Sequence, residues 1–122
     1  MLNLSHKNLD VYKISLALVK EVYRVTKVYP KEEQFVLVTQ LRRAAVSVCS
    51  NLAEGAARKS AKEKIRFYEV SRSSLVEIDT QFEISLLLDY LKKEDIAALE
   101  KHLESTFKML SKMMTNLAIT TH

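Results

Sequence analysis

The stretch from Gln40 to Arg58 constrains the fold more than any other part of the chain. Wound as an α-helix, with about 100° between successive residues, it divides into two faces of unequal width. The narrower face is polar and consists of Gln40, Arg43, Ser47, Asn51, Glu54 and Arg58. The wider face is apolar and consists of Leu37, Leu41, Ala44, Ala45, Val48, Cys49, Leu52, Ala53 and Ala56.

The width of the apolar face predicts how many partners this helix has. A surface helix of a monomeric protein needs an apolar stripe only a little wider than about 100°. Because this face is about twice as wide, we expect the helix to contact two partners. One partner is the core of its own chain, and we expect the other to be a second copy of the chain.

The rest of the chain also favours long helices. Its 122 residues include one Gly and one Pro, so few positions suit the tight turns of a β-fold. Pro30 ends a first helix, and Ser60 with Glu63 has the spacing of a capping box that opens a third. The sequence predicts one domain, residues 1–122, with helices over residues 9–28, 31–57, 61–89 and 93–117. Short connections favour an all-α, antiparallel, up-down-up-down four-helix bundle.

The first two helices have broad apolar arcs, whereas the fourth has a narrow one, so we expect the first two to make the contacts between subunits. Arg42 projects into the apolar arc, which suits either a subunit contact or a pair with an acid across the bundle. Cys49 lies on the same arc. We interpret it as a small buried hydrophobe, because a nucleophilic thiol would need a base and no base lies nearby. The expected interface residues are Tyr12, Leu18, Val22, Arg42, Val46, Cys49 and Ala53.

Positive charge is concentrated in one segment. The net charge of the chain is +4, and residues 58–66 contain five basic residues and one acidic residue. Such a cluster predicts binding to phosphate or to an acidic surface, although a solvated helix end has the same pattern. The candidate nucleic-acid-binding residues are Arg58, Lys59, Lys62, Lys64 and Arg66. Arg43 is a further candidate that would extend this binding surface.

No motif in the sequence indicates catalysis. His6, His102 and His122 are not spaced for a triad or a metal site, and no glycine-rich loop or Cys-x-x-Cys is present. We therefore expect a non-enzyme with no cofactor and no metal.

No apolar run approaches the roughly 18 residues of a membrane span, and the first residues lack the pattern of a signal peptide. A cytoplasmic protein without a membrane partner is expected.

Several blocks of the sequence resemble one known family. They include Gln40-Leu41-Arg42-Arg43-Ala44-Ala45, Asn51-Leu52-Ala53-Glu54-Gly55 and Tyr29-Pro30. The chain resembles the four-helix bundle proteins encoded in intervening sequences of bacterial 23S ribosomal RNA genes. The resemblance implies an up-down-up-down bundle that assembles as a ring-like homo-oligomer, a homopentamer. It also implies a fold similar to that of retroelement accessory proteins, which bind a reverse transcriptase and nucleic acid. One departure is Asp89, where the family often has Gly.

Two functions follow as hypotheses. The first is a non-catalytic oligomer that binds RNA or DNA through the basic cluster, with phosphate contacts and little sequence reading. The alternative is a protein-interaction adaptor, such as an accessory subunit of a reverse transcriptase from a retroelement. A third hypothesis is that the chain is a relic of a mobile element and needs no ligand.

Overall fold

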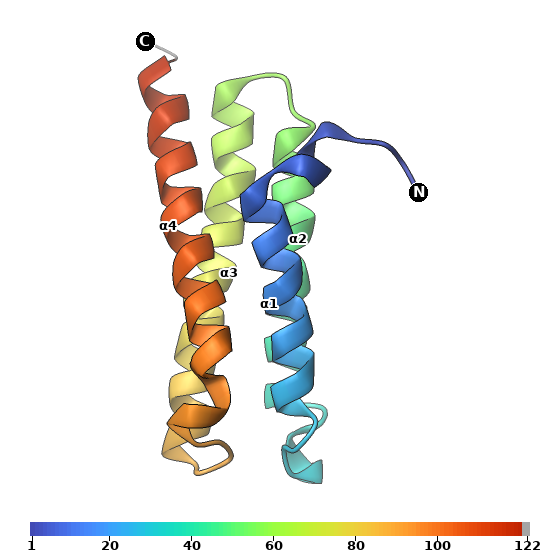
Figure 1. The fold of residues 1–122 in the computed structure, drawn as a ribbon, viewed down its shortest axis with the longest axis vertical. Helices are drawn as coiled ribbons and strands as arrows, with labels where there is room; N and C mark the ends of the chain where they lie inside the picture. The colour runs from blue at the N-terminus through green and yellow to red at the C-terminus, as the bar shows by residue number, and fades with distance from the viewer. Residues whose placement is uncertain (121–122) are drawn as a thin grey trace.

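The computed structural model describes residues 1–120, which are all-α and contain four long helices and no strand (Figure 1). The long helices are α1 (Asp10–Thr26), α2 (Leu37–Ala56), α3 (Ala61–Leu87) and α4 (Ala97–Thr120). Short 3-10 helices precede three of them: η1 (Ser5–Asn8), η2 (Lys31–Glu33) and η3 (Lys93–Ile96). The all-α fold with four helices confirms this part of the sequence-based prediction.

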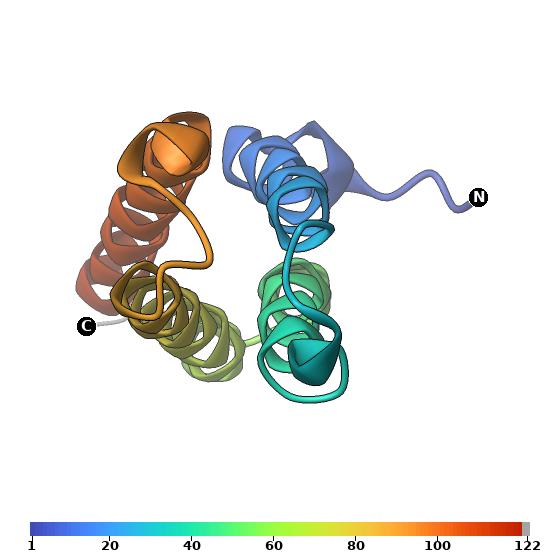
Figure 2. The same cartoon turned by 90° about the horizontal axis from the view of Figure 1, so that it is seen from below.

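The helices pack around a common core. α1 packs against α2 and α4, and α3 packs against the same two helices. Seen end-on, α1 and α2 lie on one side of the bundle while α3 and α4 lie on the opposite side (Figure 2). The connection between α2 and α3 lies at one end of the bundle, and the other two connections lie at the opposite end (Figure 1).

The second helix starts later than expected. The first residues of the predicted helix over residues 31–57 form a 3-10 turn and then an irregular stretch, and α2 begins only at Leu37. Val36 leaves the helical conformation, with φ −121° and ψ −93°. The Thr39 hydroxyl donates to the carbonyl of Gln34 at 2.7 Å, a local bond that gives this backbone an alternative to helical pairing.

The wide apolar face of α2 is covered within the chain. All nine of its residues are buried or half-buried, and Leu41, Ala45 and Val48 have no exposed surface. In a four-sided bundle each helix contacts two neighbours, so α1 and α3 together occupy the full width of this face. The inference that this width requires a second copy of the chain is therefore wrong for α2. Any subunit contact must use residues that remain exposed.

The end of α3 adopts a Schellman motif around Asp89. Asp89 has φ 61°, in the left-handed region, and its N–H donates to the carbonyl of Leu86 at 3.1 Å. The Tyr90 N–H donates to the carbonyl of Ser85 at 3.0 Å, which completes the motif. Asp89 therefore occupies the position at which glycine is the usual residue.

Replacement of Asp89 by glycine is expected to stabilise the protein by about 1 kcal/mol, because glycine adopts a positive φ without the steric cost of a Cβ. Urea unfolding at a fixed protein concentration measures this change. Asp89→Ala keeps the Cβ and removes the carboxylate, so it is the control and should not be stabilising. Equal stability of the glycine and alanine variants would contradict the steric explanation.

Candidate nucleic-acid interface

Five of the six predicted basic residues gather where α2 ends and α3 begins. Arg58 and Lys59 lie in the connection, and the other three lie in the first two turns of α3. Ser60 fixes this corner because its extended backbone precedes the helix and its hydroxyl accepts from the Glu63 N–H at 3.1 Å. The capping predicted from the sequence therefore positions the cluster.

Phe67 is a platform for two of the arginines. The Arg58 guanidinium lies 4.5 Å from the centre of the Phe67 ring, and the Arg66 guanidinium lies 5.8 Å from it. Stacking on a ring holds a planar guanidinium in place while its N–H groups stay available to a phosphate. Phe67 was not among the predicted site residues, although an aromatic residue directly after Arg66 is a sequence signal for such stacking.

Lys64 differs from the rest of the cluster. It is half-buried, and its Nζ donates to the carbonyl of Ala56 at 2.8 Å, in the last turn of α2. A cation at this position satisfies a free carbonyl and complements the negative end of the helix dipole. Lys64 therefore joins α3 to the end of α2, and its ammonium group already has a protein partner.

Arg43 lies away from the other five residues. It is exposed on α2, 13 residues before Ala56, which places it about 20 Å from that end of the helix at 1.5 Å per residue. The structure therefore does not bring Arg43 into the basic corner.

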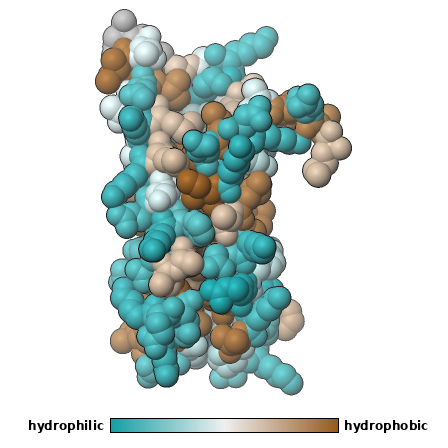
Figure 3. Space-filling model, viewed as in Figure 1, coloured by the Kyte–Doolittle hydropathy of each residue, from teal (hydrophilic) through white to brown (hydrophobic). Residues whose placement is uncertain are grey.

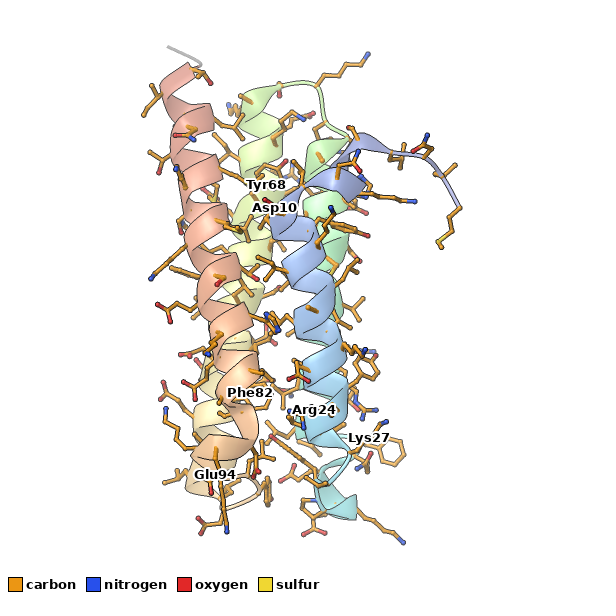
Figure 4. The ribbon with its side chains drawn as sticks, in the orientation of Figure 1. Asp10, Arg24, Lys27, Tyr68, Phe82 and Glu94 are labelled. Carbon is orange, nitrogen blue, oxygen red and sulfur yellow. The ribbon has the colours of Figure 1, made fainter. Side chains whose placement is uncertain are left out.

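The fold adds further positive charge to the corner. The half of the bundle nearest the α2–α3 connection comprises residues 1–19, 47–74 and 109–120 (Figure 1). It contains nine Lys and Arg residues against four Asp and Glu residues, whereas the other half contains ten against eleven. We call the first half the basic end. Asp10 and Tyr68 lie in it, and Phe82, Arg24 and Glu94 lie towards the opposite end (Figure 4).

Besides Arg72 of α3, three cations of the basic end were not among the predicted site residues: Lys7, Lys13 and Lys112. These three come from the segment before α1, from α1 itself and from α4. Their proximity to residues 58–66 depends on the packing of the bundle, so no local sequence pattern could have indicated it. A nucleic acid at this end would meet cations from α1, α3 and α4 and from the connection between α2 and α3.

The predicted interface residues are divided between the core and the surface. Leu18 and Val22 have no exposed surface, so they belong to the core of the chain and cannot contact another subunit as folded. Cys49 is also buried, and its thiol donates to the Ser15 hydroxyl at 3.2 Å. Burial raises the pKa of the Cys49 thiol, which disfavours the reactive thiolate. Tyr12 and Ala53 are half-buried.

Arg42 and Val46 are the most informative interface candidates. Val46 is 44% exposed on α2. The Arg42 guanidinium stacks 4.5 Å from the centre of the Tyr23 ring, and its Nε donates to the Thr26 hydroxyl at 3.0 Å. Its Nη2 donates to the carbonyl of Tyr23 at 3.4 Å, so Arg42 ties α2 to the end of α1. The alternative in which Arg42 pairs with an acid across the bundle is therefore wrong.

Residues 1–120 show no constellation of metal ligands. No three His, Cys, Asp or Glu residues of this part of the chain converge on a position suited to a metal ion. His6 is buried with its ring edge-on to Tyr12 at 4.8 Å, and His122 lies outside the described residues. Among the helices described, none has the length and apolar character needed to cross a membrane.

Comparisons with known proteins place this fold. A solved structure from Bacteroides thetaiotaomicron, described as a protein of unknown function from the S23 ribosomal protein family, superposes with a TM-score of 0.78. That chain is 18% identical, and the match covers 85% of this chain and 97% of the other, so the likeness concerns the fold. No curated protein matches the chain significantly. The sequence pattern of the family described as 23S rRNA-intervening sequence protein matches residues 7–112. The chain therefore belongs to the 23S rRNA-intervening sequence protein family.

Proposed function

We propose that the chain is an antiparallel four-helix protomer of a ring-like homo-oligomer, a pentamer by family resemblance, which binds RNA or other nucleic acid without catalysing a reaction. The observation that carries this proposal is the basic end, where residues 58–66 place five cations on one corner and the fold adds others. Each further copy in a ring repeats this positive field and raises the local attraction for a polyanion.

The surface favours phosphate contact over base reading. Phe67 is the aromatic residue in contact with the two arginines, and both guanidinium groups already cover it. Stacking platforms for single strands instead offer free aromatic faces to successive bases. A structured RNA bound through its backbone therefore fits the basic end better than an unpaired strand.

The test is a titration of a structured RNA at two or more salt concentrations. If Arg58, Lys59, Lys62 and Arg66 each contact a phosphate, the slope of log K against log salt is about −3 to −4 per protomer. Lys59→Glu/Lys62→Glu should reduce the magnitude of this slope by about two and weaken binding at least about tenfold at low salt. Both residues are exposed, so we expect the variant to fold normally, which circular dichroism checks.

The matched control is Lys31→Glu/Lys101→Glu, which makes the same charge change at exposed positions of the opposite half. It should bind RNA almost as well as the native protein. Equal losses of RNA affinity in the two variants would show that binding depends only on the net charge of the protein. Absence of RNA binding at low salt would contradict the proposal, and binding of a protein partner that survives Lys59→Glu/Lys62→Glu would favour the adaptor function.

A further inference from the structure

Two opposite sides of the bundle carry exposed apolar residues with opposite charges around them. The outer side of α1 and α2, which we call the basic face, has an apolar centre formed by Leu16, Val19, Tyr23 and Val46. Its surrounding cations are Lys13, Lys20, Lys27, Arg42 and Arg43. Figure 3 shows apolar surface beside the upper part of α1, below the N-terminal segment.

The outer side of α3 and α4, which we call the acidic face, is a groove of about 410 Å³. The buried Leu75 and the half-buried Leu103 lie at its floor, with Val76 52% exposed and Phe107 39% exposed on its walls. The acids of this face are Glu69, Asp79, Glu83, Glu100 and Glu104.

The acidic face has few cations, and each of them already has a partner within the chain. Arg72 lies 6.0 Å from the centre of the Phe107 ring and donates to the Ser111 hydroxyl at 3.3 Å, so it forms part of the groove wall. Lys108 pairs with Glu104 at 2.7 Å, and Lys93 pairs with Glu100 at 3.3 Å. Surface pairs of this kind contribute at most about 1 kcal/mol, so an approaching cation can replace them.

The two faces lie at the same height along the bundle. On α2, Arg42 contacts the end of α1, and Ser47 accepts from the Ser74 hydroxyl of α3 at 3.0 Å. Val46 therefore lies level with the neighbours of Ser74 on α3. Arg72, two residues before Ser74, reaches α4 at Phe107 and so brings the acidic groove to that same level.

The basic and acidic faces cannot contact each other within one chain, because they lie on opposite sides of the bundle (Figure 2). They can meet when the basic face of one copy approaches the acidic face of the next. A contact between two different surfaces of identical chains is heterologous, and it closes into a ring if the rotation per subunit allows. Pairing of like faces would instead place cations against cations or acids against acids.

We propose that the acidic groove of α3 and α4 receives the basic face of α1 and α2 from a second copy of the chain. Val46, Leu16 and Tyr23 cover the apolar groove, while Lys20 and Arg43 meet the acids at its rim. This inference rests on the ring of the proposed function and specifies the two surfaces that form it. It also gives Arg43 a role separate from the nucleic-acid interface.

The experiment uses two charge-reversed variants of the full chain. One is Asp79→Lys/Glu104→Lys on the acidic face, and the other is Lys20→Glu/Arg43→Glu on the basic face. All four positions are exposed, so circular dichroism should show native helix content. Light scattering after size exclusion should give an oligomer for the native chain and mainly protomers for each variant at micromolar concentration.

Mixing the two variants in equal amounts provides the decisive measurement. In the mixture the unchanged acidic face of one variant meets the unchanged basic face of the other, and the two reversed faces are also complementary. We therefore expect the two variants to form complexes that contain both chains and are heavier than a protomer. Two alternating variants cannot close a ring of five without one contact between like charges, so the measurement is association of the two chains and not recovery of the native mass. The control Glu32→Lys/Glu77→Lys changes charge by the same amount at exposed sites outside both faces and should assemble like the native chain.

Assembly of both variants like the native chain, or failure of the mixture to assemble, would overturn this inference. A native chain that scatters as a single protomer would overturn both this inference and the ring. The RNA titration of the native chain is a separate measurement, so it shows whether the basic end binds nucleic acid whatever the assembly. The two proposals can therefore fail independently.

Discussion

Replacement of Leu41 by alanine is expected to lower the free energy of unfolding by about 2–5 kcal/mol, because it removes buried methyl groups and leaves a cavity. Leu41 has no exposed surface and lies on the face of α2 that packs within the bundle. Urea unfolding followed by circular dichroism at one protein concentration measures the change. A fixed concentration matters because association stabilises the folded state.

The control for Leu41→Ala is Leu87→Ala, the same chemical change at a position that is 79% exposed at the end of α3. Its effect should lie within about 0.5 kcal/mol. Comparable effects at the two positions would contradict the burial of Leu41 against neighbouring helices of its own chain. The pair therefore tests whether the wide apolar face of α2 is buried in the folded protein.

Replacement of Gly55 by valine is expected to destabilise the protein by about 3 kcal/mol, because side-chain atoms here overfill a closely packed contact. A Cβ at Gly55 would lie 2.7 Å from Cε1 of Tyr68 and 3.0 Å from Cβ of Phe67. The Tyr68 ring is buried, so it has little room to move. Glycine at this position therefore lets α2 and α3 approach closely beneath the basic corner.

Thermal unfolding by circular dichroism measures the effect of Gly55→Val. Ser73→Val places the same residue at an exposed position of α3 and should change stability by less than about 0.5 kcal/mol. In the double variant Gly55→Val/Tyr68→Ala, the valine should cost much less than in the native background, because the ring that it meets is gone. If Gly55→Val lowered stability as much in the Tyr68→Ala background as in the native protein, the contact with Tyr68 would not be the cause of the destabilisation.

Local patterns in the sequence were sufficient to predict the helices and one of their ends. The start of α3 follows directly from Ser60, because a capping side chain acts on N–H groups only a few residues away. The start of α2 was misplaced because the 3-10 turn after Pro30 is followed by an irregular stretch, in which Val36 leaves the helical conformation and the Thr39 hydroxyl bonds to the carbonyl of Gln34. The left-handed Asp89 shows that a residue other than glycine occupies this position at a helix end.

The candidate site depended more on the fold than on the sequence. Residues 58–66 are contiguous, so their charge was visible in the sequence, and the stacking of Arg58 on Phe67 required only the geometry of one corner. The role of Lys64 at the end of α2 and the separation of Arg43 from the cluster required helix positions in space. The apolar width of α2 was misread because a helical wheel counts apolar residues but does not show how many neighbours cover them.

The most direct test of the nucleic-acid interface is to locate the bound RNA on the protein. Ultraviolet crosslinking of a structured RNA to the native chain, followed by mass spectrometry of the digested protein, identifies the residues in contact. We predict crosslinks within residues 58–66 and none within residues 89–101 at the opposite end of the bundle. Crosslinks concentrated at residues 89–101, or spread evenly over the surface, would contradict the assignment of the basic end as the binding site.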